Sequence, residues 1–298
     1  MDSLHTPILP TQSKKGRSPI PAFISNWTAQ TKSSTTPINI QRQSSNQPTQ
    51  EIRIYTLGRF SALKQQGEVK ICGKGQRKSL ELLKTVIALG GREIGETRIN
   101  EALWPDSEGD VAHTAFAVTL HRLRKLIGAK ALTLIDGRLT LNADYCWVDA
   151  WQCERLIGEI KSALHQSRCD QSTILDKTNK LLNLYHGPYL GNEDEQAWFL
   201  SYRARLHSKF QRCLIAACHH LENHNRGQTA IELYEHCLQI DDLFELAYLR
   251  LMHCYLKLGR RVDALATYHR CQEIFEAHLA TNPSDEMRAL YKTMQQCA

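Results

Sequence analysis

A cluster of cations that could do chemistry lies in one short segment in the first half of the chain, residues 113–127. His121, Arg122, Arg124 and Lys125 fall within five positions, and no acidic residue interrupts them. A guanidinium can donate paired hydrogen bonds to guanine O6 and N7, whereas lysine mainly neutralises phosphate. On a helix, this chemistry suits the recognition of double-stranded DNA. The alternative is the ordinary charged surface of an amphipathic helix.

Helical periodicity separates this segment into two faces. At 100° per residue, an apolar stripe of Phe116, Leu120, Leu123 and Ile127 is predicted to be core. The opposite face and its flanks carry the DNA-binding candidates Thr114, Ala117, Val118, His121, Arg122, Arg124 and Lys125. Small residues at the start permit close approach to a major groove, where Thr and Val can contact thymine methyl groups. Arg124 and Lys125 suit phosphate contacts.

The elements around this segment are predicted from local patterns. Short antiparallel strands are expected at 52–56, 60–62 and 69–72, and helices at 77–89, 96–103 and 110–127, with Thr97 as a candidate cap. A hairpin is expected at 132–135 and 139–141, around Asp136-Gly137-Arg138. Helix-turn-helix followed by a hairpin is typical of a winged helix, in which the third helix reads DNA. Arg138, at the hairpin tip, is then a further DNA-binding candidate.

The second half of the chain, from Val148 onward, is predicted to be all-helical. Residues 226–240 align with residues 260–274 at an offset of 34, and Ala, Tyr, Cys and Ile recur. That offset is the period of tetratricopeptide repeats, whose concave face usually binds a partner. Flanking helices near 150–185, 196–223 and 285–296 are expected to complete the stack.

The excess of positive charge lies in the first half of the chain, because residues 151–298 hold 17 basic and 18 acidic side chains. The chain has 37 Lys and Arg against 31 Asp and Glu, a net charge of +6. Residues 1–50 are polar and hold too few apolar side chains for a core, so a disordered tail is expected. No apolar run is long enough for a transmembrane helix, and the N-terminus does not resemble a signal peptide. We therefore expect a cytoplasmic protein without membrane contact.

Neither catalytic nor metal chemistry is indicated. The ten cysteines are scattered without a C-x-x-C pair, which favours reduced, buried thiols. The histidines and the acid at 219–224 are predicted to form a solvated helix end rather than a metal site. No nucleophile–base–orienter pattern occurs, and Gly73-Lys74-Gly75 lacks the spacing of a nucleotide-binding loop. We expect no cofactor and no enzyme.

Two groups of short motifs follow one another in a definite order along the chain. The first group includes Leu57-Gly58-Arg59-Phe60, Ala102-Leu103-Trp104-Pro105-Asp106 and Leu120-His121-Arg122-Leu123-Arg124. The second includes Tyr185-His186-Gly187-Pro188, Ala230-Ile231-Glu232-Leu233-Tyr234 and Gly259-Arg260-Arg261. With these motifs the chain resembles bacterial transcriptional regulators of the antibiotic-regulatory-protein type. They pair an OmpR/PhoB-type winged helix with a bacterial transcriptional activator domain of tetratricopeptide character.

The resemblance implies a domain division and a function. It implies a winged helix-turn-helix at 51–147 and an activator domain at 148–298, behind the tail at 1–50. It implies a transcription factor, often an activator, that reads direct repeats near promoters. By position, the DNA-contacting residues would be Thr114, Val118, His121, Arg122 and Arg124. In similar proteins a Trp that contacts the DNA backbone can occur at the position of Trp104. Packing at the end of a helix is the equal alternative.

The resemblance also implies partners. The loop at 104–109 can face RNA polymerase in similar proteins. The neutral helical domain is expected to contact polymerase or a co-regulator, or to form a homodimer on tandem repeats. The alternative function is that of an adaptor or scaffold whose helical domain binds a protein partner.

Overall fold

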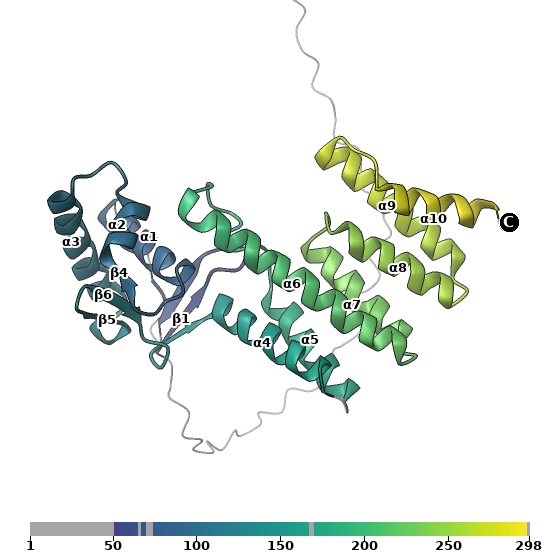
Figure 1. The fold of residues 1–298 in the computed structure, drawn as a ribbon, viewed down its shortest axis with the longest axis horizontal. Coiled ribbons are helices and arrows are strands. Elements are labelled where there is room, and N and C mark those ends of the chain that lie inside the picture. Colours follow the sequence, from purple (N-terminus) through teal and green to yellow (C-terminus); the bar gives the residue numbers. More distant parts are fainter. Residues whose placement is uncertain (1–50, 65–66, 70–73, 167–169, 297–298) are drawn as a thin grey trace, which may run out of the picture. The chain divides into compact units, whose positions relative to one another are not determined.

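The computed structural model describes residues 51–64, 67–69, 74–166 and 170–296 (Figure 1). The predictions for the tail at 1–50 and for the strand positions 70–72 lie outside these residues. The described part is mainly helical, with small sheets confined to the first half and to the strand that leads into the second half. Within these ranges, no helix is long and apolar enough to cross a membrane.

The strands of the described residues form two sheets. They are β1 (Ile52–Tyr55), β2 (Ser61–Lys64), β3 (Gly67–Glu68), β4 (Ile94–Gly95), β5 (Leu132–Ile135), β6 (Arg138–Leu141) and β7 (Cys146–Val148). One sheet has the order β3-β2-β1-β7 and the other has the order β4-β6-β5. The first two predicted strands are confirmed. The third lies at Gly67–Glu68, before the predicted start at Val69.

The helices of the first half are α1 (Lys74–Ala88), α2 (Glu96–Leu103) and α3 (Gly109–Ile127). The predicted bounds of α2 are confirmed, but Thr97 is not its cap. Gly95 occupies the N-cap position, and no side chain makes a capping hydrogen bond there. As predicted, α3 ends at Gly128, whose N–H donates to the carbonyl of Arg124.

The apolar stripe predicted on α3 is buried as expected. Phe116, Leu120, Leu123 and Ile127 are at most 3% exposed. They pack with α1, where Leu82, Leu83, Val86 and Ile87 are fully buried. Burying one such side chain contributes about 1.5–3 kcal/mol, so this contact is the main force that holds α3 in place. The opposite side of α3 is left free to face outward.

The predicted hairpin is confirmed, with a correction at its tip. Asp136 and Gly137 have positive φ angles of 48° and 70°, and they join β5 to β6. Two such residues in a two-residue loop match the right-handed twist of the flanking strands. Arg138 pairs with Ile135 as the first residue of β6, so it lies beside the turn rather than in it.

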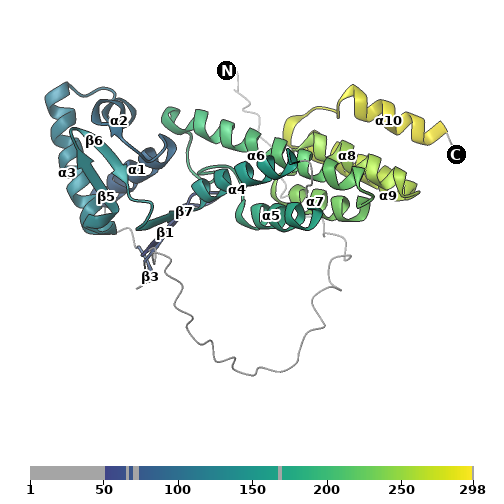
Figure 2. The ribbon, with the colours of Figure 1, turned by 60° about the horizontal axis from the view of Figure 1, so that its bottom comes forward.

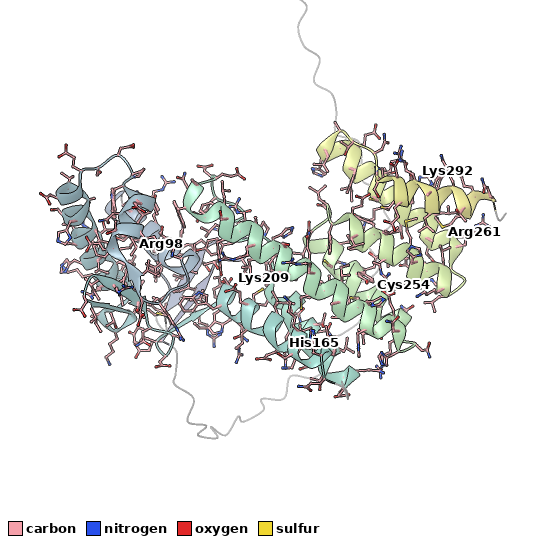
Figure 3. All side chains as sticks on the ribbon, viewed as in Figure 1. Arg98, His165, Lys209, Cys254, Arg261 and Lys292 are labelled. Atoms are coloured by element: carbon pink, nitrogen blue, oxygen red, sulfur yellow. The ribbon has the colours of Figure 1, made fainter. Side chains whose placement is uncertain are left out.

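The second half continues as helices that pack on their neighbours (Figure 2). They are α4 (Asp149–Leu164), α5 (Gln171–Leu184), α6 (Ala197–Asn223), α7 (Gly227–Ile240), α8 (Glu245–Lys257), α9 (Arg261–Leu279) and α10 (Asp285–Gln296). The 34-residue offset relates α7 to α9, and the recurring Ala, Tyr and Cys positions are buried in both helices. An ion pair of 2.9 Å joins α6 to α4 through Lys209 and Glu154; Lys209 is labelled in Figure 3.

A buried carboxylate connects the first sheet to the start of α4. Asp149 accepts hydrogen bonds from the Thr56 N–H at 2.7 Å, the Thr56 hydroxyl at 2.6 Å and the Leu57 N–H at 2.9 Å. Burial raises the pKa of Asp149, and these hydrogen bonds oppose that rise. The predicted domain boundary at 147 falls inside β7, which pairs in parallel with β1.

A second contact joins the two halves beside Asp149. The Gly58 N–H donates to the carbonyl of Pro188 at 2.9 Å, and the Tyr189 hydroxyl donates to the carbonyl of Lys84 at 2.7 Å. Gly58 has a φ of 81°, and a Cβ there would lie 2.8 Å from the carbonyl oxygen of His186, so no other residue fits. We call Thr56–Gly58, Asp149 and residues 185–190 the joint.

Candidate nucleic-acid interface

The candidates on α3 share one solvent-exposed face, with one exception. The exposed residues are Thr114, Ala117, Val118, His121, Arg122 and Lys125. Residues 111–127 of the helix contain no acid. The acids of this region are Asp106 and Glu108, which precede the helix, and Asp110, which lies in its first turn. An acid at the start of a helix and cations in its last turn also complement the helix dipole. The cationic end of α3 is thus suited to phosphate.

Two cations of this face lie next to the start of α1. A shallow hollow of about 320 Å³ is lined by Gly75, Gln76, Arg122, Lys125 and Leu126. A Cβ placed on Gly75 would lie 3.0 Å from Nη1 of Arg122, so the guanidinium rests against the first turn of α1. That turn contains no acid. Arg122 and Lys125 therefore border a surface that the negative backbone of DNA can approach.

Arg124 is the exception among the α3 candidates. Its side chain is half-buried, and Nη2 donates to the carbonyl of Leu132 at 3.3 Å. Leu132 begins β5, so this guanidinium ties the end of α3 to the hairpin. This hydrogen bond attaches the guanidinium to the hairpin. Less of the side chain is therefore accessible to a phosphate than the sequence predicts.

Trp104 and Arg138 lie near one another around a single cleft. The cleft has a volume of about 620 Å³, and its lining includes Glu96, Trp104, His113, Asp136 and Arg138. Trp104 is half-buried at the C-cap of α2, with Nζ of Lys78 5.4 Å from its ring centroid. Trp104 also packs against the hydrophobic core, in agreement with the packing role. Arg138 is exposed.

One contact of this region was not predicted. Nδ1 of His113 lies 2.6 Å from Oε1 of Glu96, which links α3 to the first turn of α2. The two residues are 17 positions apart on different helices, so no local pattern signals the pair. The pair links the two helices at an exposed position.

The histidine-rich end of α6 is the predicted solvated end at His219 and His224, which are exposed, but not at Glu222. Glu222 is 2% exposed in its side chain and accepts hydrogen bonds from Tyr234 at 2.9 Å and Arg250 at 2.5 Å. These partners come from α7 and α8, so tertiary packing overrides the polar local sequence. Burial, and then the neighbouring His224, lower the pKa of His220. Across the described ranges, no group of three or more potential ligands could hold a metal ion.

Comparison with known proteins places a family in the second half. Residues 148–295 match the family described as the bacterial transcriptional activator domain. A bacterial transcriptional activator domain is therefore present in the chain. Such a domain is regulatory rather than catalytic, in agreement with the expectation that the chain is not an enzyme. No curated protein matches the sequence.

A solved structure resembles more of the chain. The Mycobacterium tuberculosis protein EmbR, in complex with a low-affinity phosphopeptide, is 18% identical with a TM-score of 0.57. The match covers 83% of this chain and 65% of EmbR, so the chain spans less than two thirds of that protein. The activator domain accounts for only about half of the chain. A match over 83% of the chain therefore also includes residues before position 148.

Proposed function

We propose that the protein is a sequence-specific DNA-binding transcriptional regulator, and specifically an activator. In this proposal residues 51–147 are an OmpR-type winged helix, and residues 148–298 are the activator domain with tetratricopeptide-like helix pairs. The observation that carries it is the exposed, acid-free face of α3, which is backed by a buried stripe and followed by a hairpin. Helix α3 would enter the major groove, and the β5–β6 hairpin would be the wing.

The position of each side chain supports a role. Arg122 is exposed, and residues 111–127 of its helix contain no acid, so it would donate paired hydrogen bonds to guanine, while Lys125 would neutralise phosphate. Arg138 would contact the minor groove or a phosphate from the wing. Arg124 would hold the hairpin and contact phosphate. Thr114, Ala117, Val118 and His121 would meet base edges, and Trp104 the backbone.

The helical domain would supply regulation rather than DNA contacts. Residues 151–298 hold 17 basic and 18 acidic side chains, so they lack the positive field that attracts nucleic acid. We assign to this domain self-association on tandem repeats, or contact with RNA polymerase or a co-regulator. Two copies on adjacent repeats would each raise the effective concentration of the other. Tight binding to paired sites but weak binding to a single site, measured with the full chain, would support self-association.

The test is a comparison of matched arginine variants of the full chain. The protein first selects binding sites from a random pool of DNA duplexes, and the affinity for the selected site is then measured by fluorescence anisotropy. Arg122→Ala should cost about 1–3 kcal/mol of binding free energy with an unchanged melting temperature. Arg212→Ala removes an exposed arginine from α6 and is the control. Full affinity in Arg122→Ala would contradict the groove assignment, and failure of the unchanged protein to select any DNA site would favour the adaptor function.

A further inference from the structure

An apolar stripe occupies the amino-terminal half of the exposed face of α3. Val111, Thr114, Ala115 and Val118 are spaced by three or four residues, so they lie along one side of the helix. They line one shallow hollow, together with Asp110, Thr119 and Arg122. Val111 is 59% exposed and Val118 is 44% exposed. We call Val111, Thr114, Ala115 and Val118 the methyl patch.

Thr114 adds a methyl group to this patch rather than a polar one. Its hydroxyl donates to the carbonyl of Asp110 at 2.9 Å, inside its own helix. That hydrogen bond occupies the only polar group of the side chain as a donor. The patch therefore presents mainly carbon atoms over two helical turns, and the charged residues that line the same hollow, Asp110 and Arg122, come at its two ends in the sequence.

An exposed apolar patch needs an apolar partner, and its location limits the choice. Clustered rather than single exposed apolar side chains are typical of interaction sites. The patch shares the helix face that carries His121, Arg122 and Lys125, which is the face assigned to the major groove. Of the groups that unmodified base pairs present in that groove, the C5-methyl of thymine is the apolar one. The same group is present on 5-methylcytosine.

We propose that the methyl patch recognises a 5-methylpyrimidine in the major groove, and that Val118 is the residue that determines this specificity. This inference depends on the proposed DNA-binding function and names the base chemistry that it reads. Helical rise places Val111 and Val118 about 10 Å apart, which spans about three base-pair steps, and Arg122 about 6 Å further on. The recognised site therefore has its methyl-bearing pyrimidines about two base pairs from the guanine bound by Arg122.

The test removes single methyl groups from the DNA. In the duplex that the full chain selects, each thymine is replaced in turn by 2′-deoxyuridine, which lacks only the C5-methyl. At the contacted position the affinity should fall roughly fourfold, the value expected for one buried methyl group. Val118→Ala should weaken binding to the thymine duplex by a similar factor. In that variant, the same deoxyuridine replacement should have no further effect.

A second arm separates the two sources of the methyl group. The contacted thymine pair is changed to a cytosine pair, with and without a 5-methyl group on the cytosine. Recovery of affinity on methylation would show that the methyl group alone is read, whereas no recovery would show that thymine itself is required. Val262→Ala, a change of the same kind at a valine on α9 that is 78% exposed, is the control and should bind as the unchanged protein does.

The outcomes separate this inference from the function on which it depends. Sequence-selective binding that no deoxyuridine replacement weakens would overturn the methyl-patch proposal and leave the regulator function intact. Binding without any sequence preference would overturn the function itself. Circular dichroism of Val118→Ala checks whether it is folded. Val118→Thr, which keeps the shape and one methyl group, should retain part of the discrimination.

Discussion

Two arginines on α3, only two positions apart, have different surroundings. Arg122 is exposed against the first turn of α1, whereas Arg124 is half-buried and donates to the carbonyl of Leu132. A hydrogen bond from a charged donor to a carbonyl stabilises a fold more than an exposed cation does. The two residues should therefore differ in what their loss affects.

Removing Arg124 should lower both stability and DNA affinity. For Arg124→Ala we expect a loss of about 1 kcal/mol of unfolding free energy, because the link between α3 and the hairpin is broken. Urea unfolding of the full chain measures this loss, and Arg122→Ala, with unchanged stability, is the comparison. Equal stability of the two variants would mean that the hydrogen bond to Leu132 contributes nothing.

The cysteines of the described residues are free and buried, as the sequence predicted. They are Cys146, Cys153, Cys213, Cys218, Cys237, Cys254 and Cys271. Cys254 is marked in Figure 3, among the helices of the second half. Cys72, Cys169 and Cys297 lie outside the described residues. Burial raises the pKa of Cys146, Cys254 and Cys271 to about 12.

These buried thiols should be inert in the folded protein. With a pKa of about 12, roughly one thiol in ten thousand is ionised at pH 8, and only the thiolate reacts with alkylating reagents. Iodoacetamide should leave Cys146, Cys254 and Cys271 unmodified in the native protein and modify them in urea. Mass spectrometry of the digested protein checks each site. Fast native labelling of any of the three would show that its surroundings open to solvent.

At the scale of single elements, α8 carries a histidine that is unfavourable to protonate. Burial lowers the pKa of His253, and the nearby Arg250 lowers it further, whereas Glu286 and Glu222 act in the opposite direction. In the unfolded chain His253 has a pKa of about 6.5, whereas in the folded chain its pKa is lower. Stability from this residue is therefore present above pH 6.5 and is lost as the pH falls below that value.

The melting temperature should accordingly drop between pH 7.5 and pH 5.5. His253→Gln should reduce the size of that drop, because glutamine does not titrate. His278→Gln, at an exposed position in the last turn of α9, is the matched control and should leave the drop unchanged. Scanning calorimetry at several pH values measures the difference. A drop that is identical in all three proteins would assign the pH dependence to other groups.

Elements with strong local signals were predictable, and contacts between distant segments were not. Helix α2 matched its predicted bounds because Trp104-Pro105 ends it, and the Asp136-Gly137 turn specified the hairpin. Strand β4 has two residues and pairs with β6, some 44 residues later, so it has no alternation to detect. Arg124 has a cationic local pattern that fits a DNA face, yet the half-buried side chain contacts the hairpin, which only the fold reveals.

At the scale of the whole molecule, the joint makes the two halves share one hydrophobic cluster. Buried residues from β1, α1 and α3 belong to the same cluster as those of α4 to α10. Asp149, in the joint, is 2% exposed and is hydrogen-bonded to Thr56 and Leu57. Residues 51–296 should therefore lose structure in a single transition, even though we assign them two functions.

Removing the carboxylate of Asp149 tests this coupling. Asp149→Ala leaves buried N–H groups without an acceptor, and each such group costs about 1–3 kcal/mol. We expect a loss on the order of 3 kcal/mol in the unfolding free energy, and calorimetry should then show two separate transitions. Asp176→Ala removes an exposed acid from α5 as the control. A single transition at an unchanged temperature would show that Asp149 does not connect the halves.

The joint also limits how such a chain can be recombined with others. A chimera joined at residue 147 would remove the acceptor of Thr56 and Leu57 together with the turn that packs on Gly58. A foreign helical half would have to provide an aspartate and a matching turn at the same places. Grafts that exchange the β1–β2 turn along with the helices should fold, whereas grafts cut at the apparent boundary should fail. The unit that can be inherited or transplanted intact is thus larger than either functional domain.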